Sequence, residues 1–347
     1  MGGPALPDKG GFSLVVAKYG PGGAHLWSNG YGTQMQKNTI GYTVGIDKLS
    51  NNDIIVAGSF EGHLDFGVGS STSVNDTEDI FIVKLNSSGT PLWAKFFGGS
   101  GDDRAESVII KNNGEIVVTG SFKNTVDFSN NGHNLTSASG TADVFLAKYD
   151  QNGNLRWARA ISDQYEGYGY GIALDPNDNP VITGSFSGNA DFGDGINKFA
   201  SIRDIFLAKY LDQGTTSAHS WSKAIGNVGV VTLTNEGFGV AVESGGNIAI
   251  TGSFKGIVNF AGDGSVIQNR LTSVGSEDIF VAKYEPDGDY IWARRFGGTD
   301  IDTGNDVAVD NSGKIVVSGS FSGTAEFNGE NTTSNGVNDV FVLKLEP

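Results

Sequence analysis

The sequence has 347 residues, a net charge of −16 and no cysteine, and it contains 52 glycines but only 8 prolines. With 18% charged residues, this composition favours many short strands joined by turns over long solvated helices. The lack of cysteine excludes disulfides, zinc–thiolate sites and thiol catalysis. The basic residues are scattered singly and no apolar run approaches the roughly 18 residues of a membrane span, so we expect neither a nucleic-acid partner nor membrane insertion.

Residues 1–11 are predicted to form an N-terminal extension, and a repeat of about 65 residues begins near Phe12. The stretch "TGSFKGIVNF" and its near copies place a glycine at intervals of 62 to 68 residues, and tryptophans recur at intervals of 64 to 71 residues. The glycines are Gly58, Gly120, Gly184, Gly252 and Gly319, and the tryptophans are Trp27, Trp93, Trp157, Trp221 and Trp292.

Four strand-like segments follow one another within each repeat. In the first complete repeat they are "YTVGID", "IIVAGSF", "DIFIVKL" and "PLWAKFF". Short turns with glycine join the first to the second and the third to the fourth, which is typical of an antiparallel meander. Consecutive apolar residues such as Val144, Phe145 and Leu146 indicate that both faces of each sheet are buried. Radially repeated four-stranded sheets of this kind form a β-propeller, so we predict one all-β propeller domain over residues 12–347.

The strand count predicts how the propeller closes. There are five first, five second and five fourth strands but six third strands, because both "FSLVVAKY" and "DVFVLKL" qualify. We expect five four-stranded blades, the last one closed by joining N-terminal and C-terminal strands. The extra third strand would add to the outer edge of a blade. The alternatives are six blades, a fragment of a longer array, or pairing of the extra strand with a neighbouring molecule.

The repeat resembles a known family. "DIFVAKYEPDGDYIWARRFGG" and "DVAVDNSGKIVVSGSFSGTAEF" are similar to the SBBP β-propeller repeat of exported and surface-associated bacterial proteins, and the resemblance runs over nearly the whole chain. It implies a propeller outside the cytoplasm, extracellular, at the cell surface or in the periplasm. It implies little about chemistry, because this repeat is a scaffold.

The polar residues that recur in every repeat are predicted to stabilise the repeat and not to form a catalytic site. We expect the serine after each motif glycine to belong to a strand bulge rather than to a nucleophile site, since an active site is normally built once. The acidic or amide residue that ends each motif is predicted to cap backbone amides, and the lysine that ends each third strand is predicted to meet the repeated acidic residues. The motif ends are Asp65, Asp127, Asp191, Asn259 and Glu326, and the lysines are Lys18, Lys84, Lys148, Lys209, Lys283 and Lys344.

No cofactor is expected, with one reservation about calcium. Asp300, Asp302 and Asp306 have an oxygen spacing that calcium loops use, but the glycine is misplaced for an EF-hand and no bidentate glutamate follows. A solvated loop between blades is the main prediction there. Because the chain has no cysteine and no histidine pair at metal spacing, we expect no zinc or copper site.

Binding residues are expected in the long, variable loops that follow the second and fourth strands, since such loops carry function on rigid scaffolds. Tyr165, Tyr168 and Tyr170 lie in "SDQYEGYGYG", and Asn235 and Phe238 lie in the enlarged fourth repeat. Tyrosines interleaved with glycine suit protein or sugar recognition, although two of the three tyrosines could instead pack into the start of the blade.

The predicted function is a non-enzymatic scaffold or binding module of an exported bacterial protein. It would contact a protein partner, or a second copy by strand addition at an unpaired edge. The alternative is a carbohydrate-binding, lectin-like propeller with a glycan ligand, for which equivalent residues should recur in every repeat.

Overall fold

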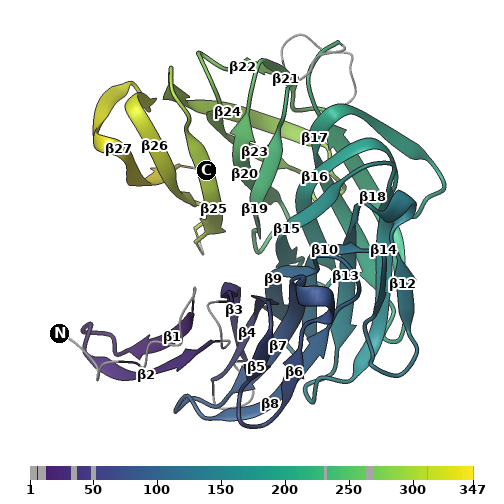
Figure 1. The fold of residues 1–347 in the computed structure, drawn as a ribbon. Helices are drawn as coiled ribbons and strands as arrows, with labels where there is room; N and C mark the ends of the chain where they lie inside the picture. The colour runs from purple at the N-terminus through teal and green to yellow at the C-terminus, as the bar shows by residue number, and fades with distance from the viewer. Residues whose placement is uncertain are drawn as a thin grey trace. The chain divides into compact units, whose positions relative to one another are not determined.

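The computed structural model describes residues 6, 13–32, 37–47, 52–229, 233–262, 269–310 and 312–346. Regular structure in these residues is β-strand, apart from two short 3-10 helices, η1 (Val74–Asp76) and η2 (Ala138–Gly140) (Figure 1). The chain divides into two compact units, residues 1–160 and 161–347, and each is described by itself. No helix within the described ranges is long and apolar enough to cross a bilayer.

The first unit contains a two-stranded sheet and two four-stranded antiparallel sheets. The two-stranded sheet pairs β1 (Leu14–Tyr19) with β2 (His25–Tyr31). The next sheet has the order β3 (Thr39–Asp47), β4 (Asp53–Phe60), β7 (Asp79–Leu85) and β8 (Pro91–Phe97). The following sheet has the order β9 (Arg104–Ile110), β10 (Ile116–Lys123), β13 (Ala142–Tyr149) and β14 (Leu155–Asp163), whose end belongs to the second unit.

The second unit contains two more four-stranded sheets and one of three strands. The first has the order β15 (Gly167–Leu174), β16 (Pro180–Asp191), β17 (Asn197–Asp212) and β18 (Ser217–Ile225). The second has the order β19 (Glu236–Val242), β20 (Ile248–Phe254), β23 (Asp278–Tyr284) and β24 (Tyr290–Gly298). The third has the order β25 (Thr303–Val309), β26 (Ile315–Phe327) and β27 (Glu330–Leu345). The four complete sheets confirm the predicted meander, whereas closure into five blades stays a prediction.

The segments after the second strands are more regular than the sequence suggests. Three of them form short hairpins, and in β16–β17 and β26–β27 the same hairpin is continuous with the main strands. The separate hairpins are β5 (His63–Asp65) with β6 (Ser70–Thr72), β11 (Thr125–Asp127) with β12 (Asn134–Thr136), and β21 (Ile257–Asn259) with β22 (Arg270–Thr272).

Successive sheets in each unit pack face to face, as in a propeller. In the first unit, Ile80 and Ile82 of β7 share one core with Phe145, Ala147 and Tyr149 of β13, and each of these side chains is at most 2% exposed. First strands also lie beside first strands of the next sheet: a methyl group on Gly45 of β3 would meet Ile110 of β9 at 3.3 Å. Both faces of a complete sheet are therefore buried, which explains the consecutive apolar residues of the third strands.

The motif glycine lies opposite a β-bulge in every repeat. In β15 and β16, Gly169 pairs with Gly184 and Gly171 with Thr183, so Tyr170 is an extra residue without a partner. A side chain on Gly184 would overlap the carbonyl oxygen of Tyr168, which explains why glycine recurs there. A bulge therefore exists beside the motif glycine, as predicted. Its extra residue lies in the first strand, however, and not in the Gly-Ser pair of the second strand. The extra residues are Tyr42, Glu106, Tyr170, Phe238 and Asn305.

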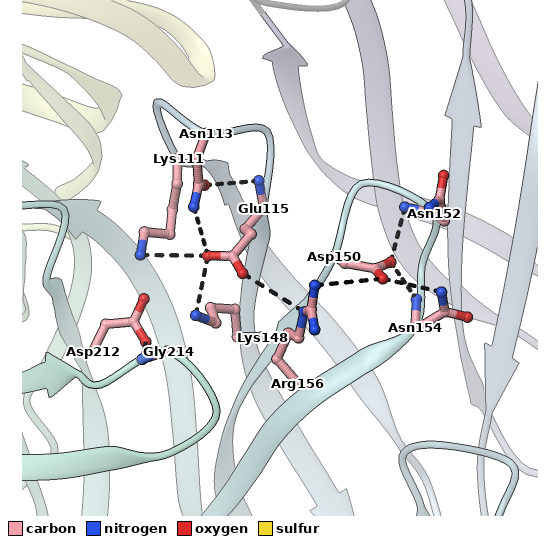
Figure 2. A network of polar contacts seen from close by, with 10 residues as sticks. All are labelled: Lys111, Asn113, Glu115, Lys148, Asp150, Asn152, Asn154, Arg156, Asp212 and Gly214. Carbon is pink, nitrogen blue, oxygen red and sulfur yellow. Dashed lines mark hydrogen bonds and ion pairs between the residues drawn. The ribbon is translucent and has the colours of Figure 1, made fainter.

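The lysine of the third strand meets a carboxylate at the end where the short turns lie. Lys148 contacts Glu115 at 3.0 Å, and Lys111 and Arg156 both lie 3.7 Å from the same carboxylate (Figure 2). In the other repeats the partner is an acidic residue at the position of Lys111, so the acidic partner has moved to Glu115 where that position is basic. Those pairs are Lys84 with Asp47, Lys209 with Asp175, Lys283 with Glu243 and Lys344 with Asp310. The predicted pairing with carboxylates is confirmed for these five lysines, but the partners lie at the turn after the first strand and not at the motif ends. Lys18 instead donates to the carbonyl of Ser87.

The residue that ends each motif caps a turn. Asp127 accepts hydrogen bonds from the backbone N–H groups of Ser129, Gly132 and His133. Desolvation is the largest single influence and raises its pKa, but the hydrogen bonds together outweigh it, so the pKa is lowered. The equivalent bonds run from Gly67 to Asp65, Gly193 to Asp191, Ala261 to Asn259 and Gly329 to Glu326. The capping prediction is confirmed in all five repeats.

Three of the repeated tryptophans join one sheet to the next. The indole N–H of Trp93 on β8 donates to the carbonyl of Gln151, in the turn between β13 and β14, at 3.2 Å. Trp27 donates in the same way to Ser87, and Trp221 to Pro286. Tryptophan thus links the fourth strand of one sheet to the turn of the following sheet.

Candidate functional site

The candidate site lies at the N-terminal ends of β15 and β19 in the second unit. Alternation along "GYGYG" places glycine on the buried positions and leaves Tyr168 and Tyr170 half-buried. The bulge adds Tyr170 in β15 and Phe238 in β19 as extra residues of two consecutive first strands. Bulges re-aim side chains away from the normal alternation, and here they bring aromatic rings from two repeats together.

The three rings contact one another in succession, with Tyr168 stacked on Tyr170 and Phe238 tilted against Tyr170. The ring centroids of Tyr168 and Tyr170 are 5.9 Å apart with an interplanar angle of 5°, and Tyr170 and Phe238 are 5.1 Å apart at 49°. These separations lie in the range in which aromatic pairs attract each other beyond simple burial. The stack therefore has a defined geometry before any ligand arrives.

Arg203 of β17 completes the arrangement. Its guanidinium carbon lies 5.2 Å from the ring centroid of Tyr168, and its two terminal nitrogens pair with Glu236 at 2.8 Å and Glu166 at 3.0 Å. Burial acts against the charge of Arg203, but the hydrogen bond and the negative charge of Glu236 outweigh it, so the pKa of the guanidinium is raised. We call Tyr168, Tyr170, Phe238 and Arg203, with Glu166 and Glu236, the aromatic–arginine cluster.

The chemistry of this cluster suits recognition. The guanidinium lies over Tyr168 and Tyr170 stacks beside it, while both carboxylates are engaged by Arg203. The phenol group of Tyr170 also donates to Glu236, at 3.4 Å. Rigid tyrosine and arginine side chains of this kind are the residues that dominate protein interfaces.

Two of the five predicted binding residues lie apart from this stack. Tyr165 lies in the turn before β15 with 55% of its surface exposed. Asn235 is fully buried, and its side chain donates to Asp204 and Asn227 and accepts from the backbone N–H of Lys255. Asn235 therefore links neighbouring repeats, and we leave it out of the candidate site.

The first unit carries a charged cluster at equivalent positions. Arg104 bonds to Glu78, and Tyr42 and Glu106 are the bulge residues of β3 and β9. Burial raises the pKa of Glu106 to about 7, with Arg104 lowering it and Glu78 raising it. The same scaffold positions thus hold different chemistry in different repeats.

Two junctions between repeats each contain a pair of buried acidic residues. Asp103 accepts from the N–H groups of Gly99 and Lys123, and burial, with nearby Asp79, raises its pKa to about 8. Burial also raises the pKa of Asp79 to about 7. Asp278 and Asp302 repeat this arrangement beside Gly297, and both pKa values are raised by burial.

The possible calcium ligands are not brought together as a set. Both carboxylate oxygens of Asp302, which is fully buried, accept backbone N–H groups, from Ser322 and Gly298. Asp306 lies in β25 and accepts from Val307, while the carboxyl group of Asp300 lies against Gly323. Within the described ranges, no three His, Cys, Asp or Glu side chains form a group suited to a metal ion.

Sequence reasoning missed Arg203, Glu166 and Glu236. Each was visible as a charged residue beside a predicted strand, but the bulge that aligns them follows from backbone contacts between strands. A usable signal is the pattern "GYG" at residues 169–171 and "GFG" at residues 237–239, at the start of the first strand, in which the residue between the two glycines is the bulge residue.

Comparisons with known proteins give distant similarities. No family model matches the chain. An uncharacterised WD repeat-containing protein of Acanthamoeba polyphaga mimivirus is 26% identical over 387 residues, and the match covers 92% of this chain but 27% of that protein. Among solved structures, a candidate gluconolactonase aligns with a TM-score of 0.33 and 12% identity over 86% of this chain and 87% of that chain. The extracellular domain of a candidate hybrid two-component system from B. thetaiotaomicron aligns with a TM-score of 0.21 and 11% identity. This alignment covers 88% of this chain and 46% of that chain.

Proposed function

We propose that this chain is a non-catalytic protein-binding module and that the aromatic–arginine cluster is its contact surface. The observation that carries the proposal is that the ring of Tyr168 contacts both the guanidinium of Arg203 and the ring of Tyr170. Because the side chains are held in place by stacking and by two ion pairs, little conformational entropy is lost when a partner binds. Tyrosine and arginine in such settings supply most of the binding energy at protein interfaces.

A protein partner fits the cluster better than a glycan. Sugar rings stack on open aromatic faces, whereas Arg203 lies over Tyr168 and Tyr170 packs beside it. A lectin-like propeller should also repeat its binding residues, but the bulge residues of the five repeats differ in chemistry. The carbohydrate-binding alternative is therefore the second choice.

The cellular setting is part of the proposal. The resemblance to the SBBP repeat supports an exported or surface-associated bacterial protein, extracellular or periplasmic. Joining the two-stranded sheet and the three-stranded sheet within one chain would give the closed ring that the sequence predicts, with one third strand in excess.

The proposal is tested by selecting peptides from a phage-displayed random library on the immobilised chain. We expect peptides that bind the unmodified protein and bind Tyr168→Ala at least about tenfold more weakly, a loss of about 1.4 kcal/mol. Arg203→Lys should weaken the same peptides, because lysine cannot pair with Glu166 and Glu236 through a planar fork.

Tyr165→Ala is the matched control, since Tyr165 is an exposed tyrosine outside the stack. Circular dichroism should confirm that all variants remain folded. Peptides that bind the Tyr168→Ala variant as tightly as the unmodified protein would contradict the proposal. Binding on a glycan array that is lost in Tyr168→Ala would favour the lectin-like alternative.

A further inference from the structure

A cavity lies in the second unit between two complete sheets, β15–β18 and the sheet of β19, β20, β23 and β24. It has a volume of about 330 Å³, and its lining includes Phe199, Asp204, Ala224, Gly226 and Asn259. This volume falls within the range of small-molecule sites, roughly 300 to 1,000 Å³. The first four residues come from one repeat and Asn259 comes from the next, so the cavity is a junction between neighbouring repeats.

The following junction of the same unit holds a guanidinium group in the corresponding place. Arg295 of β24 donates from Nη1 to Asp278 at 2.9 Å and to the carbonyl of Gly297 at 3.3 Å. Its Nη2 lies 3.9 Å from Glu326. A carboxylate, a backbone carbonyl and the residue that ends the motif therefore surround the guanidinium there.

The strand register shows which residues of the two junctions correspond. Ala224 pairs with Phe206 of β17 as Arg295 pairs with Phe280 of β23. The three groups around the Arg295 guanidinium have counterparts in the cavity lining, which are Asp204 for Asp278, Gly226 for Gly297 and Asn259 for Glu326. The cavity thus lies where a guanidinium lies one repeat later, and the short side chain of Ala224 leaves the space open.

Asp204 is a buried carboxyl group, 8% exposed, and none of the described Lys or Arg side chains forms an ion pair with it. Its Oδ1 accepts a hydrogen bond from the side chain of Asn235 at 3.2 Å. Burial raises the pKa of Asp204 to about 6, although hydrogen bonds from Asn235 and Asn227 act in the opposite direction. At pH 8 the cavity therefore contains a carboxylate that has been removed from water without a cation beside it.

Phe199 adds an aromatic wall that the other junction lacks. It pairs with Asn189 in the hairpin of β16 and β17, and 64% of its surface is exposed. The corresponding residue of β22 is Thr272, which pairs with Ile257. A planar guanidinium and its aliphatic stem pack well on an aromatic face, so Phe199 suits an arginine side chain that arrives from outside.

We propose that this cavity binds the guanidinium group of an arginine side chain in a partner protein or peptide. The bound group pairs with Asp204 and packs on Phe199, and it takes the place that the chain's own Arg295 takes in the next junction. The net charge of −16 favours the approach of a basic segment. The cavity shares no residue with the aromatic–arginine cluster, so this inference does not depend on the proposed function.

Isothermal titration calorimetry at pH 8 with N-acetyl-arginine amide tests the proposal. N-acetyl-citrulline amide has the same shape without the charge, and N-acetyl-lysine amide has the charge without the planar fork. We expect the arginine probe to bind to a single site on each chain, at least about tenfold more tightly than either matched probe.

Three variants locate the site. Asp204→Asn should bind the arginine probe at least about tenfold more weakly, and Phe199→Thr about threefold more weakly. Ala224→Arg should abolish binding without lowering the melting temperature, because the new side chain can fill the cavity as Arg295 does. Asp287→Asn is the matched control: it makes the same change of charge in the exposed turn between β23 and β24, and it should bind like the unmodified chain.

Several results would overturn the proposal. One is an arginine probe that binds no more tightly than the citrulline or the lysine probe, or that does not bind at concentrations up to about 20 mM. Another is a folded Asp204→Asn or Ala224→Arg variant that binds the arginine probe like the unmodified chain. If Asp204→Asn does not fold, Ala224→Arg and the comparison of probes decide.

Discussion

Replacing Asp79 with asparagine should make the protein more resistant to alkaline conditions. Burial raises the pKa values of Asp79 and Asp103 from 3.8 to about 7 and about 8, and the carboxylate of Asp79 further disfavours the ionisation of Asp103. The folded state therefore holds more protons than the unfolded chain over most of the range between about pH 4 and pH 8. This stabilisation is complete below about pH 4 and is lost as the pH rises through these two pKa values.

The size of the effect follows from the shift in pKa. For Asp103 alone, a folded-state pKa of about 8 corresponds to a loss of about 4 kcal/mol of unfolding free energy between pH 5 and pH 9. An asparagine at position 79 is neutral, keeps the acceptor for the N–H of Val74, and places an amide where Oδ1 of Asp79 has no hydrogen-bond partner. That amide can donate to Asp103, as the side chain of Asn235 donates to Asp204.

Urea unfolding followed by tryptophan fluorescence at pH 5 and pH 9 measures this. We expect Asp79→Asn to be about 2 kcal/mol more stable than the unmodified protein at pH 9 and within about 1 kcal/mol of it at pH 5. Asp127→Asn controls for the change in net charge, since the pKa of Asp127 is lowered and its loss should destabilise equally at both pH values. Two results would refute this prediction. One is an unmodified protein with the same unfolding free energy at pH 9 as at pH 5. The other is an Asp79→Asn variant that loses as much unfolding free energy between these pH values as the unmodified protein loses.

Two further substitutions test the scaffold. Gly184→Ala should lower the unfolding free energy measured with urea by about 3 kcal/mol or more, because the methyl group would overlap the carbonyl of Tyr168. Gly245→Ala is the control: a methyl group there meets nothing within 4 Å, so the unfolding free energy should change by less than about 0.5 kcal/mol. Trp93→Phe should cost about 1 kcal/mol through the lost bond to Gln151 in addition to lost packing, and a melting temperature equal to that of the unmodified protein would contradict the role of this bond.

Local patterns were enough to predict the strands and their capping. Strand order, turns and the bonds of Asp127 depend on residues close in the sequence, and these are the predictions that the structure confirms. The bulge at Tyr170 and the acidic pair of Asp79 and Asp103 depend on how strands and sheets approach one another. Arg203 reaches Glu166 and Glu236 across different strands, so its position in the sequence alone carried no sign of its role.

The bulge residue can vary without a change in the strand pairing around it. Since the extra residue stands outside the pairing of the first two strands, its side chain can change without altering the register that the motif glycine fixes. Tyrosine, glutamate, phenylalanine and asparagine already occupy this position in different repeats. Each repeat therefore has one position at which the side chain can be exchanged. Substitutions at these five positions would change the chemistry of the surface while the rest of each repeat stays constant.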